Sequence, residues 1–232
     1  MKWIPIIFAL SVAASIALNA IIIALRNKTQ DHAEAINKHT RPPAQKIAQS
    51  FLSSHNINNI PIEQNPPNKN QRNNTFHILE NRITLDSRVY DQTDITAVGT
   101  ACHEAAHAIS YNNRDSYYHV RNIILALSKF IEYFALASLA SHILLHSVLP
   151  FLLFTVLALS CLMTTMCIES IYHILDEAHV SQMALQYIKS NALATVEEYK
   201  LAKRALTYAW CTYILGTLPR IVICVSLILL LF

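Results

Sequence analysis

The sequence predicts a mainly α-helical membrane protein with about four transmembrane helices, a smaller polar helical part and one β-hairpin. Hydrophobic residues make up 53% of the chain and charged residues only 14%, and the mean hydropathy is +0.30. The apolar residues gather in long runs with few or no charges, whereas the polar segments between them carry helix caps and a short alternating pattern. Long apolar runs are typical of membrane helices.

The first apolar run covers residues 3–25 and contains no charged side chain. At 1.5 Å per residue, a helix of this length crosses a hydrocarbon core of ~30 Å. A cleaved signal peptide is the competing interpretation. The run continues through residues 20–25, past the only weak small-residue cleavage site, so we expect an uncleaved anchor.

Two further runs, 130–149 and 151–168, are separated by Pro150 and predict a membrane hairpin. At the start of the first run, Lys129 and Glu132 are three residues apart and could pair where the helix leaves the membrane. A fourth span, 209–232, contains Arg220. An unpaired arginine at the centre of a span costs ~2.5–3.5 kcal/mol, so Arg220 must snorkel, pair or lie near an interface.

Four spans place residues 26–121 and 169–208 on the same side of the membrane. These segments carry 15 of the 18 lysines and arginines, so the positive-inside rule places them in the cytoplasm. We therefore expect a multi-pass protein of the plasma (inner) membrane, with the lipid bilayer as a partner. The net charge of +3 is too small to predict nucleic-acid binding.

The polar segments predict several local elements. Pro42 and Pro43 suit the first turn of a helix that runs to about Ser54. Residues 75–79 and 82–86 alternate and predict a β-hairpin, and residues 195–198 form a capping box that opens another helix. The hairpin could offer a strand edge to an extended peptide, or it could only cap the core.

The central motif is His-Glu-Ala-Ala-His at residues 103–107, inside a segment (93–111) that predicts a helix capped by Thr93 or Asp94. On a helix, His103 and His107 lie on one face and can hold one zinc ion, while Glu104 can act as a general base on a water. About 0.02 such motifs are expected by chance in a chain of this composition. The motif therefore predicts a metal site.

A catalytic zinc ion needs three protein ligands, and no further histidine follows His107 within ten residues. After the membrane hairpin, residues 169–185 predict a helix with several candidate ligands. Glu177 or Asp176 is well placed, and His173 and His179 remain possible.

Cys102 points about 100° away from His103 on a helix, so we expect a small packed residue there, and the five cysteines form no disulfide framework.

Three stretches resemble a known family: A-V-G-T-A-C-H-E-A-A-H-A-I (97–109), R-I-T-L-D-S-R-V-Y (82–90) and E-A-H-V-S-Q-M-A-L (177–185). They resemble the bacterial integral-membrane neutral zinc metallopeptidases (YugP-like peptidases) and, more distantly, the HtpX-type membrane proteases. The resemblance covers nearly the whole chain, but only the HExxH core is specific by itself.

The resemblance implies a zincin-like domain in which zinc is held by His103, His107 and Glu177, with Glu104 as the catalytic base. In the HtpX-like pattern, an aspartate four residues after the glutamate ligand supports a zinc histidine. Ser181 holds that place here and brings no charge. His179 also departs from the pattern, and on a helix it points away from Glu177, so we expect it to have no catalytic role.

These features divide the chain into five segments. They are an N-terminal transmembrane anchor (1–25), a zincin-like part with the hairpin and HExxH helix (26–121), a transmembrane hairpin (122–168), helices with the third ligand (169–208) and a C-terminal transmembrane helix (209–232).

The leading hypothesis is a membrane-embedded zinc endopeptidase that cleaves a protein or peptide at a cytoplasm-facing site. The alternatives are a catalytically inactive zinc-binding membrane adaptor and, with less support, a transporter.

Overall fold

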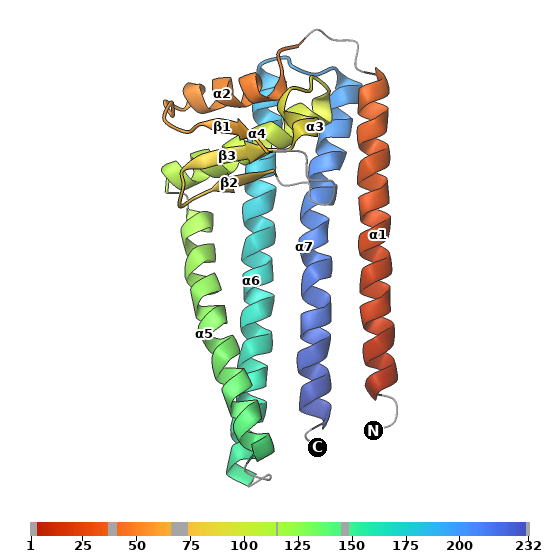
Figure 1. Cartoon of the computed structure of the whole chain (residues 1–232), viewed down its shortest axis with the longest axis vertical. Helices are drawn as coiled ribbons and strands as arrows, with labels where there is room; N and C mark the ends of the chain where they lie inside the picture. Colours follow the sequence, from red (N-terminus) through yellow and green to blue (C-terminus); the bar gives the residue numbers. More distant parts are fainter. Residues whose placement is uncertain (1–3, 37–40, 66–73, 115, 145–148, 231–232) are drawn as a thin grey trace. The chain divides into compact units, whose positions relative to one another are not determined.

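The computed structural model describes residues 4–36, 41–65, 74–114, 116–144 and 149–230 (Figure 1). Within these residues the chain is mainly helical with a small sheet, as predicted. The elements in chain order are α1 (Ile4–Ile36), α2 (Ala44–Ser54), β1 (Ile62–Gln64), β2 (Thr75–His77), β3 (Arg82–Leu85), α3 (Ser87–Tyr90), α4 (Ile95–Asn112), α5 (Ser116–Leu144), α6 (Leu149–Ser190) and α7 (Val196–Leu230).

The chain forms two compact units. One, called here the apolar unit, comprises Met1–Ile22, His119–Asp176 and Cys211–Phe232. The other, the polar unit, comprises Ile23–Tyr118 and Glu177–Trp210. Four helices (α1, α5, α6 and α7) contribute residues to both units, because each has an apolar part and a polar part.

Three helical segments in the described part of the chain are long and apolar enough to cross a membrane: Val12–Ile36, Asn122–Ser141 and Leu153–Ser190. The last is longer than one crossing requires, and its charge-free part ends at Ile168. The predicted fourth span, 209–232, is helical as far as Leu230 but is not among these segments. The number of four spans therefore stays a prediction.

In the apolar unit, α5 and α6 pack through small and branched residues. Ala135, Ala158, Leu159 and Leu162 form a buried cluster with Cys224 of α7. The side chains add polar links between helices: Thr155 Oγ1 donates to the carbonyl of Ser138 (3.2 Å), and Ser170 Oγ donates to Thr217 Oγ1 (2.8 Å). Small residues and hydroxyl hydrogen bonds are the usual means by which apolar helices associate.

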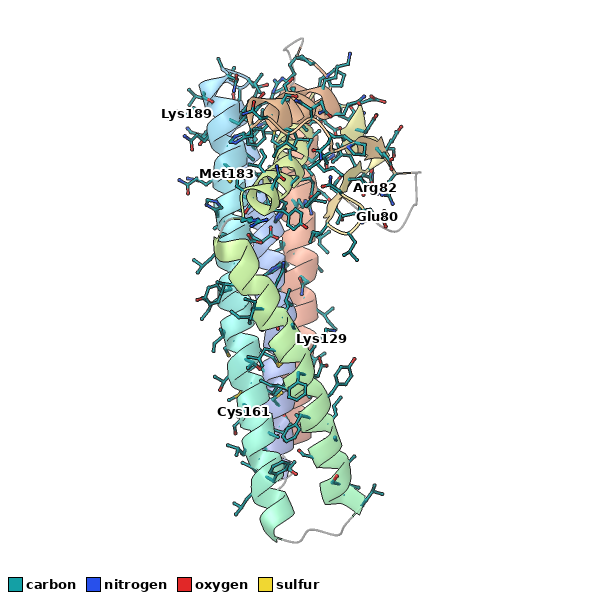
Figure 2. All side chains as sticks on the ribbon, turned by 90° about the vertical axis from the view of Figure 1, so that its left-hand side faces the viewer. Glu80, Arg82, Lys129, Cys161, Met183 and Lys189 are labelled. Carbon is teal, nitrogen blue, oxygen red and sulfur yellow. The ribbon has the colours of Figure 1, made fainter. Side chains whose placement is uncertain are left out.

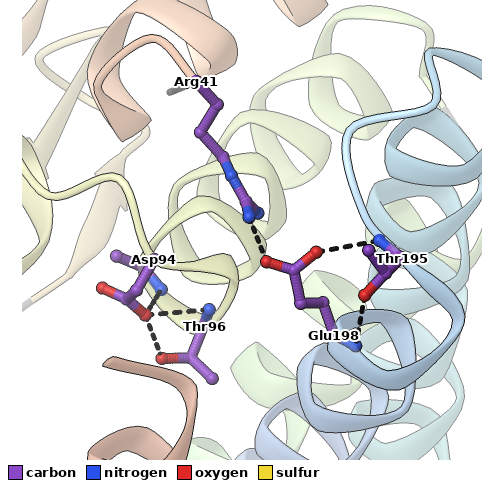
Figure 3. Close-up of polar contacts among 6 residues, drawn as sticks. Arg41, Asp94, Thr96, Thr195 and Glu198 are labelled. Atoms are coloured by element: carbon purple, nitrogen blue, oxygen red, sulfur yellow. Dashed lines mark hydrogen bonds and ion pairs between the residues drawn. The ribbon is translucent and has the colours of Figure 1, made fainter. Parts of the chain in front are cut away.

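In the polar unit, α4 is the central element. Asp94 caps its N-terminus, since one carboxylate oxygen accepts hydrogen bonds from the backbone N–H groups of Thr96 and Ala97, both at 3.0 Å (Figure 3). Of the two cap residues that the sequence allowed, the structure uses Asp94. Most residues of α4 are buried against α2, α3 and the sheet.

The sheet has the strand order β1-β3-β2. The predicted hairpin is confirmed: β2 and β3 pair antiparallel, with Phe76 opposite Ile83, and both side chains are buried. β1 adds to the other side of β3 in parallel, which the sequence did not predict. β2 is thus an edge strand among the described residues, and it contacts α4 (Figure 1).

A buried ion pair joins two distant parts of the polar unit. The Arg41 guanidinium contacts the Glu198 carboxylate at the start of α7 (Figure 3). Glu198 Oε2 also accepts from the backbone N–H of Thr195 (2.8 Å), while the N–H of Glu198 donates to Thr195 Oγ1 (3.2 Å). These reciprocal bonds confirm the predicted capping box.

Candidate metal centre

The helix α4 places His103 and His107 one turn apart, so that their imidazoles lie beside each other. The ring centroids are 4.8 Å apart and the ring planes are nearly perpendicular, at 88°. His103 is buried and His107 is half-buried. The two rings therefore meet as the spacing predicted.

Glu177 of α6 faces both imidazoles. Its Oε2 atom is 3.1 Å from His103 Nε2, and its Oε1 atom is 3.5 Å from His107 Nε2. The residue is only 4% exposed, so the carboxylate and the two rings share a site shielded from solvent. The site is assembled from residues far apart in sequence, all within the polar unit.

These three residues could hold a metal ion. Each offers one ligand atom, and the atoms all lie within 4.8 Å of one another. Among the described residues they are the group found that could hold a metal ion; Asp176, His173 and His179 are not part of it. Two imidazole nitrogens and one carboxylate oxygen are a donor set that suits zinc and leaves a coordination position open for water.

The electrostatics of Glu177 reflect its neighbours. Burial raises the pKa of the carboxyl group, but hydrogen bonds and charge interactions with His103 and then His107 lower it, so that the net pKa lies well below the usual value. The carboxylate is therefore ionised at neutral pH, which is the form that can bind a cation.

Ser181, one turn after Glu177 on α6, contacts the other ring nitrogen of His103. Its Oγ atom lies 3.2 Å from His103 Nδ1 and is buried. When Nδ1 carries the proton it donates to Ser181, and the lone pair of Nε2 stays available on the side that faces Glu177. Ser181 thus occupies the supporting position that the family pattern gives to an aspartate.

Glu104 follows His103 on α4 and is held by the sheet. Its Oε2 atom accepts a hydrogen bond from the backbone N–H of Phe76 on β2, at 3.1 Å, and the residue is 9% exposed. The contact with Phe76 was not predictable from the sequence, because a backbone N–H donor does not depend on residue type. The position of the hairpin just before α4 was the only indication.

Cys102 is fully buried, and burial raises the pKa of its thiol to about 12. A thiol with so high a pKa is protonated at neutral pH and is a poor nucleophile and metal ligand. The structure confirms the expected small packed residue.

Comparison with known proteins adds an independent observation. A family model described as "Putative neutral zinc metallopeptidase" matches residues 6–232. The chain belongs to this family. No curated protein and no solved structure matches the chain. Membership of a zinc metallopeptidase family confirms zinc as the predicted cofactor, and the cluster of His103, His107 and Glu177 is a buried site that could bind it.

Proposed function

We propose that the protein is a membrane-embedded zinc endopeptidase that hydrolyses peptide bonds at a cytoplasm-facing site. In this proposal His103, His107 and Glu177 hold the zinc ion and Glu104 is the catalytic base. The observation that carries it is the cluster of these three side chains on two sequence-distant helices, with Glu104 directly after His103 on α4. Membership of the peptidase family supports the same reaction.

A zinc ion in this position supplies a Lewis acid that polarises the scissile carbonyl and acidifies water. The other steps fall to the chain's own residues. Glu104 takes the proton from the attacking water and passes it to the leaving amine as the peptide bond breaks. The hydrogen bond from the backbone N–H of Phe76 to Glu104 Oε2 holds this carboxylate against β2.

The substrate in this proposal is an extended stretch of polypeptide. β2 is an edge strand among the described residues, and the N–H of its central residue points towards Glu104. An edge strand offers backbone hydrogen bonds to an extended peptide regardless of its side chains. A peptide that joins β2 would therefore run past the proposed base.

The membrane setting rests on the long apolar helices, three of which could cross a bilayer. The cytoplasmic orientation rests on charge: 15 of the 18 lysines and arginines lie in residues 26–121 and 169–208, which include His103, His107 and Glu177.

The test is cleavage of an unstructured protein, such as casein, by the full-length protein purified in detergent. We expect turnover that stops when a chelator removes zinc and returns when zinc is added back. A Glu104→Gln variant should keep its zinc and lose turnover, because the amide cannot accept the proton. A zinc-loaded protein with no turnover would favour the adaptor, and full activity in Glu104→Gln would overturn the assignment of the base.

A further inference from the structure

The apolar unit contains a cavity of about 310 Å³ between α5, α6 and α7. This volume lies at the lower end of the ~300–1,000 Å³ typical of ligand pockets. Much of its wall is apolar and comes from leucines of α5 and α6: Leu125, Leu136, Leu139, Leu159 and Leu162. A leucine-lined cavity within helices of this hydropathy suits an acyl chain.

One buried hydroxyl in the cavity wall has no hydrogen-bond partner among the described residues. Ser128 of α5 is 6% exposed, and its Oγ atom makes no hydrogen bond in the described part of the chain. Other serines of these helices, such as Ser141 and Ser160, donate to the carbonyl four residues earlier at 2.9 and 2.8 Å. Because leaving a buried hydroxyl unbonded costs ~1–3 kcal/mol, Ser128 is available to a ligand.

Three charged side chains also line the cavity: Lys129 and Glu132 of α5 and Glu169 of α6. Lys129 lies part way along α5 (Figure 2), inside the segment Asn122–Ser141 that could cross a membrane. No ion pair joins these three to each other or to another described residue, so the pairing of Lys129 with Glu132 that their spacing allowed is not found. Unpaired charges in a hydrocarbon setting are costly and mark functional sites.

We propose that this cavity binds a phospholipid whose headgroup carries a primary amine, that is, an ethanolamine phospholipid. Its ammonium group would pair with the carboxylates of Glu132 and Glu169, its phosphate with Lys129, and a headgroup oxygen with Ser128 Oγ. One acyl chain would lie along the leucines. The inference rests on the proposed membrane insertion and is independent of the proposed catalysis.

The charges of the wall select this headgroup. Two carboxylates and one ammonium give the lining a net charge of −1, which disfavours a lipid with net negative charge such as phosphatidylglycerol. A quaternary ammonium, as in phosphatidylcholine, has no N–H group to donate to Glu132 or Glu169. A primary ammonium donates three hydrogen bonds and satisfies these acceptors.

The experiment is native mass spectrometry of the full-length protein in detergent, titrated separately with phosphatidylethanolamine, phosphatidylcholine and phosphatidylglycerol. We expect phosphatidylethanolamine to bind at least tenfold more tightly than the other two. Glu132→Gln and Glu169→Gln should each weaken its binding about tenfold, and Ser128→Leu should weaken it by filling the cavity. The matched control is Glu197→Gln, an exposed carboxylate outside the cavity, which should change nothing.

Equal binding of the three lipids, or unchanged binding in both glutamine variants, would overturn the inference. Glu104→Gln should bind phosphatidylethanolamine as the parent protein does. Selective lipid binding by a protein without turnover would leave this inference intact and contradict only the proposed catalysis. Turnover without selective lipid binding would overturn this inference and leave the proposed catalysis intact.

Discussion

Ser181 supports His103 from the side opposite to Glu177. The contact between Ser181 Oγ and His103 Nδ1 is 3.2 Å long and buried, so it helps to hold the orientation of the ring. Groups that support a metal-binding histidine in this way typically change metal affinity 10–100-fold. Because a serine carries no charge, we expect its effect on metal affinity to lie at the lower end of that range.

We therefore expect Ser181→Ala to weaken zinc affinity by roughly tenfold, measured by competition with a chelator of known affinity. Ser181→Asp should bind zinc at least as tightly as the parent, because a charged acceptor holds the Nδ1 proton more strongly. Ser190→Ala is the control, since that exposed serine on the same helix bonds only near its own turn. Unchanged affinity in Ser181→Ala would remove the supporting role.

At this scale the sequence predicted much of the site. His103, His107 and Glu104 followed from the motif and its helical spacing, whereas spacing left the residue of α6 open among several neighbours and only the family resemblance implied Glu177. Adjacent residues such as Asp176 and Glu177 differ by about 100° around a helix, so the choice depends on how α6 is rotated towards α4. That rotation is set by tertiary packing. The structure brings Glu177 to the histidines; its role as a ligand stays a prediction.

Among the elements, β2 connects the sheet to the proposed base through the N–H of Phe76. Replacing Phe76 with proline removes this donor, and an edge strand can tolerate proline. We expect Phe76→Pro to lower casein turnover roughly 10–100-fold, since hydrogen bonds to charged groups contribute ~1.5–3 kcal/mol, and to keep its zinc. Phe76→Leu retains the N–H group and most of the apolar volume, so its turnover should be near that of the parent.

Zinc content reports whether the site of the proline variant is folded. Equal turnover in zinc-loaded Phe76→Pro and Phe76→Leu would show that the backbone donor does not matter.

The ion pair of Arg41 with Glu198 attaches the segment before α2 to the start of α7 (Figure 3). Both side chains are almost fully buried, at 5% and 3% exposure. Removing one partner leaves a buried charge uncompensated, so Glu198→Gln should lower the free energy of unfolding by ~3 kcal/mol at neutral pH. Chemical denaturation in detergent measures the change, and Glu197→Gln, whose side chain is 71% exposed, should have little effect.

The same pair predicts a pH dependence. Burial raises the pKa of Glu198, but the hydrogen bond from the Thr195 N–H and the interaction with Arg41 lower it by more. The net pKa in the folded protein is therefore below the ordinary value of 4.5. The contribution of ionised Glu198 to the stability of the folded protein is therefore complete above about pH 4.5. It is lost as the pH falls through the lower pKa of the folded state. The stability difference between the parent protein and Glu198→Gln should shrink over this acidic range. A constant difference would contradict the assignment.

The elements were predictable where the signal is local. The cap and helix of α4, the β2–β3 hairpin and the capping box of α7 each depend on residues close in sequence. The pairing of β1 with β3 was not predicted, because it is parallel and joins Ile62 to Ile83 across the intervening hairpin strand. The three residues of β1 carry too short a pattern to indicate a partner strand. The Arg41–Glu198 pair spans 157 positions, and no local rule connects them.

For the whole molecule, three of the four apolar runs overlap helical segments that could cross a membrane, and the charge distribution predicts their orientation. This can be tested with a single cysteine at Ser190, an exposed position of the polar unit, in a chain whose five cysteines are replaced by alanine. A membrane-impermeant maleimide should label it in inverted membrane vesicles and leave it unlabelled in intact cells. Labelling only from outside would reverse the proposed topology.

The central claim is that residues 74 positions apart, His103 and Glu177, meet at one zinc ion. The most direct measurement is the zinc content of three purified proteins: the parent, Glu177→Gln and the neighbouring control Asp176→Asn. We predict about one zinc ion per chain in the parent and in Asp176→Asn, and little zinc in Glu177→Gln, because an amide replaces the anionic ligand. Full zinc content in Glu177→Gln, or its loss in Asp176→Asn alone, would contradict the account.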